Sequence, residues 1–171
     1  MSVYTPLEPS QIQAFLQRYG LVLQQQIPIL NGIENSNWFI HDSGGQRWVL
    51  TVFEALPTTA VQQLATLMHL LHRQGIRVAA PIPAQDGQVV QQLQHKPAQL
   101  APCLSGQHPE QPSVGVCRQM GQALAQLHQA LDSVHLQPVA GNADTDWTGL
   151  GVSMRGELAL ADQHLLDRLL V

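Results

Sequence analysis

Apolar residues recur every three or four positions between Pro9 and Tyr19, which predicts a helix with Ser10 as its N-cap and Gly20 as its stop. Three segments rich in β-branched and aromatic residues follow, and they predict an antiparallel meander. They cover 21–30, 37–41 and 47–54, joined by an Asn31-Gly32 turn and an Asp-Ser-Gly-Gly hairpin at 42–45.

Helical spacing returns after the meander, from Thr58 or Thr59 as N-cap to about Gln74, with Gly75 ending the helix. Two short strands are then predicted at 88–93 and 97–104. A polar, proline-containing stretch follows, and Ser113 opens an amphipathic helix. A last helix begins near Leu158, and its apolar stripe has no later element to cover it.

This order predicts an α+β fold, in which a five-stranded antiparallel sheet packs with a helix and leads into a mostly helical part. The boundaries we expect are a compact lobe at 1–104, a hinge or linker at 105–112, and the start of a helical region at 113–171. Because its last apolar helix is uncovered, we expect the chain to be truncated, or to bury that helix on a partner or a second copy.

Charge and composition narrow the class of partner. The net charge is -4 and charged residues make up 12% of the chain, so nothing favours nucleic acid. Two cysteines are too few for a disulfide framework and fit free thiols in a reducing cytoplasm. No apolar run approaches membrane-spanning length. We therefore expect a cytoplasmic protein without a membrane partner.

Several short motifs occur in one order along the chain and together resemble the N-terminal part of bacterial homoserine kinases. These belong to the aminoglycoside-phosphotransferase-like group of the protein-kinase-like superfamily. The most specific pair is Glu-Asn-Ser-Asn at 34–37 followed by Leu-Thr-Val-Phe-Glu at 50–54. The others are Val-Tyr-Thr at 3–5, Lys-Pro-Ala at 96–98, Pro-Cys-Leu-Ser-Gly at 102–106 and Leu-Ala-Gln-Leu-His at 124–128.

The resemblance implies a kinase-like small lobe that binds ATP with Mg²⁺ and a whole enzyme that phosphorylates the hydroxyl of homoserine, in threonine biosynthesis. A glycine loop with amide side chains lets the backbone approach phosphate, and a strand running into a hinge offers apolar walls for adenine. The cofactor-binding residues it implies are Gly32, Glu34, Asn35, Ser36, Asn37, Thr51, Pro102, Cys103 and Leu104.

The sequence departs from the superfamily pattern at the third strand. Thr51 stands where a lysine is usual, and the helix at 58–74 has no acid to pair with one. A lysine–acid pair of that kind is therefore not expected. Thr51 could donate one hydrogen bond but could not neutralise phosphate. Lys96, the single lysine of the chain, is expected far from this position, near the hinge.

The catalytic groups of the superfamily have no counterpart here. The sequence contains no His-Gly-Asp, Asp-Phe-Asp or Asp-Phe-Gly motif, and Asp144 and Asp146 precede the region where such residues would fall. We also expect no metal ligands, since His69 and His72 are more typical of a half-buried helix surface. The expected chain is thus inactive by itself. Two alternatives stay open: a kinase for another small alcohol of choline or aminoglycoside type, and a non-catalytic nucleotide-binding or interaction module.

Overall fold

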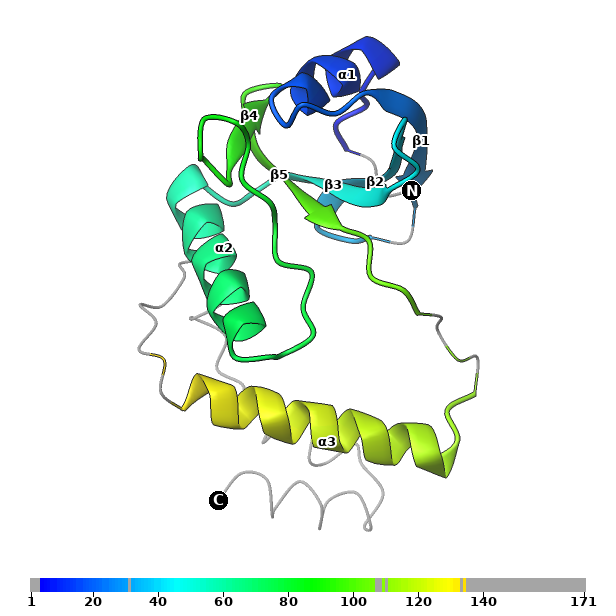
Figure 1. The fold of residues 1–171 in the computed structure, drawn as a ribbon, viewed down its shortest axis with the longest axis vertical. Coiled ribbons are helices and arrows are strands. Elements are labelled where there is room, and N and C mark those ends of the chain that lie inside the picture. Colours follow the sequence, from blue (N-terminus) through cyan, green and yellow to red (C-terminus); the bar gives the residue numbers. More distant parts are fainter. Residues whose placement is uncertain (1–3, 31, 107–108, 110, 133, 135–171) are drawn as a thin grey trace, which may run out of the picture. The chain divides into compact units, whose positions relative to one another are not determined.

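The structure is a computed structural model that describes residues 4–30, 32–106, 109, 111–132 and 134. Over these residues the predicted α+β fold, with a five-stranded antiparallel sheet, is confirmed (Figure 1). The elements in chain order are α1 (Pro9–Gln17), β1 (Leu23–Ile29), β2 (Asn35–Asp42), β3 (Arg47–Phe53), α2 (Thr58–Arg73), β4 (Gln91–Leu93), β5 (Lys96–Pro102) and α3 (Val114–Leu131).

The sheet has the order β1-β2-β3-β5-β4, and all of its neighbouring pairs are antiparallel. β1, β2 and β3 form the predicted meander, and α2 lies in the connection that leads to β4 and β5 (Figure 1). Pro28 pairs with Trp38 inside β1. The proline is tolerated because β1 is an edge strand, which needs only half of its backbone groups for the ladder.

Alternation along β2 separates the two faces of the sheet. Ser36, Trp38 and Ile40 are buried, whereas Asn35, Asn37 and the residues that alternate with them are half-buried. The buried side packs against α1 through a core of large apolar side chains, and Figure 1 shows α1 against this face. The members of this core are Leu7, Ile12, Phe15, Leu16, Trp38, Ile40, Trp48, Leu50, Val52, Leu93, Ala98 and Leu100.

A second, smaller cluster forms where α2 meets the strands. Phe53, at the end of β3, packs with Val61 and Ala65 of α2 and with Val90 just before β4. Phe53 has the strand parity of Thr51, so this cluster lies on the side of the sheet opposite α1. α2 therefore covers one end of that face and leaves the residues farther along β2 and β3 half-buried.

The predicted N-caps of the first two helices are wrong. α1 begins at Pro9 with Glu8 as N-cap, whose N–H donates to the Gln11 side chain, so Ser10 lies within the first turn. Proline favours the first helical position because its φ is already helical, and this moves the start forward. α2 has Pro57 as N-cap, while the Thr58 hydroxyl accepts a hydrogen bond from Gln92 at 3.0 Å instead of capping the helix.

The strand boundaries also differ from the prediction, most clearly in β2, β4 and β5. β2 begins at Asn35, two residues early, because the ladder with β3 continues to the Asn35–Phe53 pair. β4 is limited to 91–93, since the preceding residues turn around Asp86, whose carboxylate accepts from the Gln88 N–H. β5 runs from Lys96 to Pro102 and so ends before the predicted Leu104.

α3 begins where the sequence predicts it. The Ser113 hydroxyl accepts a hydrogen bond from the Val116 N–H at 3.3 Å, as an N-cap does. Its apolar residues Val114, Met120 and Leu124 are exposed. The predicted last helix, and with it Asp144, Asp146 and the stripe proposed for self-association, lies outside the described residues. In the part of the chain that is described, none of the helices is long and apolar enough to cross a bilayer.

Candidate functional site

The face of the sheet opposite α1 carries a row of polar side chains across three strands. Asn37 of β2 stands opposite Thr51 of β3, and Thr51 stands opposite Gln99 of β5. Side chains in direct register point to the same face, so these three residues form one line, which we call the polar row. All three are half-buried.

Hydrogen bonds orient the polar row. The Thr51 hydroxyl donates to Asn37 Oδ1 at 2.8 Å, and Asn37 Nδ2 donates to the Asn35 carbonyl at 3.1 Å. The single donor of Thr51 is thus already used, whereas the second amide hydrogen of Asn37 is left to a ligand. The buried Gln99 Oε1 has no hydrogen-bond partner among the described residues.

An apolar row lies beside the polar row, two positions away from it on each strand. Phe39, Val49 and Ala101 are in register with one another, and we call them the apolar row. Two residues of a strand span about 6.6 Å, so polar and apolar groups follow each other at that spacing. The Arg47 guanidinium stacks 5.6 Å from the Phe39 ring centroid and bounds the apolar row on its far side.

The chain leaves the sheet next to the apolar row. Sheet pairing ends at Pro102, and the Cys103 N–H still donates to the Arg47 carbonyl at 3.0 Å. Cys103 is half-buried and Leu104 is 42% exposed. Arg77 then donates to the Ser105 hydroxyl at 3.1 Å, which ties the following residue to the segment after α2.

The β1–β2 loop, described over residues 32–34, lies on the side of the polar row that faces away from the apolar row. Gly32 is half-buried, Glu34 is exposed and Ile33 is 84% exposed. The second strand was predicted to begin at Asn37, which left Asn35 and Ser36 to the loop, whereas all three residues belong to β2. Asn35 and Asn37 face the same side as Thr51, as a shared site requires.

Ser36 faces the opposite side, toward α1, where it belongs to a compact polar group. Its hydroxyl donates to Glu54 Oε1 at 2.5 Å, and Glu54 Oε2 accepts from the Thr5 hydroxyl at 2.9 Å. The Lys96 ammonium forms an ion pair with Glu54 and donates to Thr5 Oγ1 at 2.8 Å. We call Thr5, Ser36, Glu54 and Lys96 the carboxylate cluster. The Ser36 side chain is fully buried and is directed away from the polar row.

Lys96 does not lie where the sequence predicts it. Lys96 opens β5, whereas the predicted hinge follows Pro102 at the other end of that strand, so Lys96 lies at the end of the sheet that carries the β1–β2 loop. It is not close to the hinge. The chain therefore does contain a lysine–glutamate pair, although it lies on the α1 side and not beside Thr51.

The carboxylate of Glu54 is held in its charged form. Burial opposes ionisation, but hydrogen bonds from Lys96, Ser36 and Thr5, together with the charge of Lys96, outweigh it and lower the Glu54 pKa below its usual value. Glu54 directly follows β3, opposite the start of β2. The cluster thus joins an ionised carboxylate to the strand that leads out of the loop.

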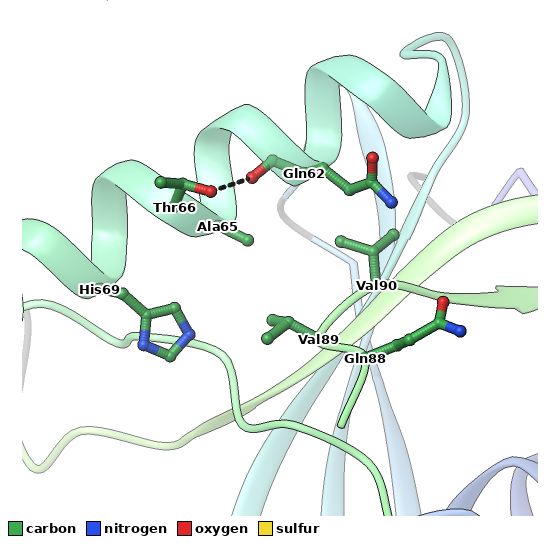
Figure 2. A pocket seen from close by; sticks show the side chains of 7 residues that line it. All are labelled: Gln62, Ala65, Thr66, His69, Gln88, Val89 and Val90. Atoms are coloured by element: carbon green, nitrogen blue, oxygen red, sulfur yellow. Dashed lines mark hydrogen bonds between the residues drawn. The ribbon is translucent and has the colours of Figure 1, made fainter. Parts of the chain in front are cut away.

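A cavity of about 230 Å³ lies elsewhere, between α2 and the segment before β4. Figure 2 shows Ala65, Val89 and Val90 in its wall, with His69 at one end. The buried His69 Nε2 has no partner among the described residues. None of the residues predicted to bind a cofactor lines this cavity. Over the described residues, no group of three or more histidine, cysteine, aspartate or glutamate side chains could hold a metal ion.

The structure thus brings Asn35, Asn37 and Thr51 together on one face and places Gly32 at the loop end of that face. Sequence reasoning missed Gln99, and it missed the apolar row as a separate element. The signal for Gln99 was strand parity, because it alternates with Ala98 and Leu100, which are fully buried. That parity is informative only once β5 is known to pair with β3.

An antiparallel sheet with α1 on one face, α2 at one end of the other face and a chain exit beside an apolar row defines a kinase-like small lobe. Residues 25–169 match the family of phosphotransferase enzymes described as APH. The chain belongs to this family.

Curated relatives support the resemblance to homoserine kinases. The chain is 39% identical over 131 residues to a homoserine kinase of Pseudomonas aeruginosa, an alignment that covers 76% of this chain and 41% of the relative. It is 34% identical over 167 residues to a homoserine kinase of Neisseria meningitidis, covering 97% and 54%. The chain therefore spans about half the length of the curated relatives it matches.

Solved structures agree on the fold. An amicoumacin kinase in complex with AMP-PNP, Ca²⁺ and Ami superposes with a TM-score of 0.70 at 13% identity, covering 88% of this chain and 51% of that chain. A spectinomycin phosphotransferase in complex with ADP and spectinomycin gives 0.64 at 17% identity, covering 91% and 49%. At this identity the likeness concerns the fold alone.

Proposed function

We propose that this chain is the nucleotide-binding part of an ATP-dependent homoserine kinase, an enzyme that phosphorylates the homoserine hydroxyl and feeds threonine biosynthesis. The observation that carries the ATP site is the succession of loop, polar row, apolar row and hinge along one face of the sheet. The identity of 34–39% to homoserine kinases supports the substrate. The two free cysteines fit a reducing cytoplasm, where we place the protein.

The adenine ring is proposed to bind over the apolar row. A flat ring needs apolar walls, which Phe39 and Val49 provide, and one or two backbone hydrogen bonds from an exposed chain segment. Pro102, Cys103 and Leu104 supply such a segment directly after β5 ends. The hinge is the proposed border of the small lobe, which gives the division into 1–104, 105–112 and 113–171.

The phosphates are proposed to bind between the β1–β2 loop and the polar row. Asn35 and Asn37 offer amide groups, Thr51 orients Asn37, and Gly32 lets the backbone come close. Glu34 would act through its backbone N–H, because its carboxylate repels phosphate. Ser36, although part of the same motif, would act only by fixing the start of β2, since its hydroxyl donates to Glu54.

Charge balance implies that magnesium accompanies the nucleotide. The polar row is neutral, so the phosphate charge must be offset by a cation that these three residues do not supply. The described residues hold no cluster of metal ligands, and the sequence contains no His-Gly-Asp motif. We propose that the metal ligands and the catalytic base belong to the half of the homoserine kinases that this chain does not span.

Thermal unfolding of the chain with increasing Mg·ATP tests this proposal, because a ligand of the folded state raises the melting temperature with its concentration. We expect a shift that Asn35→Ala and Asn37→Ala reduce and that Gln17→Ala, an exposed amide on α1, leaves unchanged. If both asparagine variants keep the shift of the parent, the phosphate assignment is wrong.

Homoserine separates the proposed kinase from its alternatives. The chain by itself is expected to show no homoserine-dependent turnover of ATP, because it offers no candidate base, and turnover by the purified chain would overturn this expectation. An ATP-induced shift together with a turnover-competent longer gene product supports the kinase. A preference of that product for another small alcohol would support the second kinase class. An ATP-induced shift of the chain without turnover by the longer product on any alcohol would support a nucleotide-binding module.

A further inference from the structure

The segment before α1 reaches across the end of the sheet and contacts the β1–β2 loop. The Tyr4 hydroxyl donates to the Ile33 carbonyl at 3.0 Å, in the exposed middle of the loop. The backbone N–H groups of Tyr4 and Thr5 donate to the Ser36 hydroxyl at 2.8 and 3.0 Å, at the point where the loop enters β2. The loop is thus held at two places by two consecutive residues.

These two residues are fixed from the other side by the carboxylate cluster. The Ser36 hydroxyl accepts hydrogen bonds from two N–H groups and donates one to Glu54. The full hydrogen-bonding capacity of the hydroxyl is therefore used. The Thr5 hydroxyl donates to Glu54 and accepts from Lys96. The N-terminal segment, β2, the end of β3 and the start of β5 therefore meet in one network.

The side chains of the network are buried where they contact the strands and exposed where they contact the loop. Ser36 is fully buried and the Glu54 side chain is 12% exposed, so their bonds are shielded from water. Tyr4 is 57% exposed, and its hydroxyl contact with the loop can be removed without disturbing the core. Because its contact with the loop is exposed while the bonds that support it are buried, Tyr4 is suited to positioning the loop rather than to stabilising the fold.

We propose that Tyr4 and Thr5 form an N-terminal clasp that positions the β1–β2 loop for the phosphates, and that Glu54 and Lys96 anchor this clasp. The inference rests on the proposed function, because the loop matters for phosphate only if ATP binds there. Lys96, the single lysine of the chain, then contributes through the clasp and not by contact with the nucleotide. All four side chains are positioning residues.

Tyr4→Phe tests the clasp, and the second tyrosine of the chain provides a matched control. The substitution removes one hydroxyl and keeps the ring. Tyr19→Phe removes the same group from the end of α1, where the Tyr19 hydroxyl has no partner among the described residues. Both variants are compared with the parent chain by amide hydrogen exchange and by calorimetric titration with Mg·ATP and with adenosine.

We expect Tyr4→Phe to accelerate exchange of the amides of residues 32–34 about three- to tenfold, which corresponds to the net free energy of one hydrogen bond. The affinity for Mg·ATP should fall by a similar factor. Adenosine, which has no phosphates, should bind as it does to the parent, and Tyr19→Phe should change neither quantity. A purely structural role of Tyr4 would weaken both ligands together.

The anchor is tested with a conservative pair. Thr5→Val should weaken Mg·ATP in the same manner as Tyr4→Phe, and Thr5→Ser, which keeps the hydroxyl, should restore the affinity. Unchanged loop exchange in Tyr4→Phe, or faster exchange without a loss of Mg·ATP affinity, overturns the clasp. If the parent chain binds neither Mg·ATP nor adenosine, the proposed function is wrong. The two kinds of failure are distinguishable because the parent chain is titrated before the variants.

Discussion

The two faces of the sheet treat polar groups in opposite ways at the same end of the same strands. On the α1 side, Glu54 and Lys96 form an ion pair supported by two hydroxyl groups. On the other side, Asn37 and Thr51 form a neutral row. Neighbouring residues of β2, Ser36 and Asn37, belong to one face each, so a single step along the strand separates charge from neutrality.

The comparison shows why a chain with one lysine can still suit a phosphate site. An ion pair fixes strands together, since each partner needs the other, whereas a neutral amide row stays available to a ligand without a counter-ion of its own. In the proposed site, the charged pair would hold the strands together and the neutral row would bind the phosphates. Kinases that place the lysine beside the phosphates combine these two tasks on one face.

The largest effect is expected from Glu54→Ala, which breaks the charged face. Removal of a buried partner leaves the Lys96 ammonium unpaired and takes the acceptor from two hydroxyl groups. Fully buried pairs lose about 3–5 kcal/mol in this way, and the 37% exposure of Lys96 reduces the expected loss of unfolding free energy to about 2–3 kcal/mol. Urea unfolding measures it. The double variant Glu54→Leu with Lys96→Met should recover more than half of the loss, and no recovery would show that the pair is not the cause.

Acid should weaken the charged face before the neutral one. The pKa of Glu54 is lowered in the folded chain, so the folded state binds fewer protons than the unfolded state. The stabilisation is complete above the ordinary pKa of 4.5 and is lost as the pH falls below it through the folded pKa. Glu54→Gln should flatten the dependence of unfolding free energy on pH in this window. Asp42, whose pKa is also lowered, keeps part of the slope, so a slope equal to that of the parent contradicts the role of Glu54.

Thr51→Val probes the neutral face with little change in shape. Loss of the hydroxyl removes the hydrogen bond that orients Asn37, and the affinity for Mg·ATP should fall about three- to fivefold. The unfolding free energy should change by less than about 1 kcal/mol, because the site is half-buried. Thr51→Ser serves as the control that keeps the donor. A fall in affinity of equal size in Thr51→Ser would indicate loss of packing instead of loss of orientation.

The smallest effect is expected from Gln99→Leu. This variant separates stability from binding, because the fold should not lose stability while the affinity for Mg·ATP should fall. Gln99 Oε1 is buried and has no partner among the described residues, which is costly, so an apolar side chain of similar size should be neutral or stabilise the fold by about 0.5 kcal/mol. Affinity for Mg·ATP should fall about twofold if the amide serves the phosphates. Gln92→Leu, an exposed amide near the start of α2, is the control for hydrophobic substitution.

The order of elements could be predicted from the sequence because it depends on local periodicity. The spacing of apolar residues predicts the helices and the meander, and a single polar residue predicts the Ser113 cap. The start of α1 was missed because Pro9, with its fixed φ, takes the first helical position. At both Glu8 and Pro57, a residue of a better capping type follows within the next two positions.

The site was predictable only in part, because faces and pairings are non-local. The motif at 34–37 contains Asn35 and Asn37, which share one face of the sheet, but strand parity divides the motif and turns Ser36 to the other face. Lys96 meets Glu54 across 42 positions of sequence, a contact that depends on β5 pairing with β3 rather than on any spacing. Without that pairing, Gln99 and the apolar row also have no visible connection to Thr51.

The engagement of Lys96 has a practical consequence for chemical labelling. It carries the only side-chain amine in the sequence, so an acylating reagent directed at amines has a single side-chain target. The rate of its acylation therefore reports whether the ammonium is held by Glu54 and Thr5, and modification would neutralise the charge that holds them. One adduct, counted by mass spectrometry, would both measure this contact and abolish it.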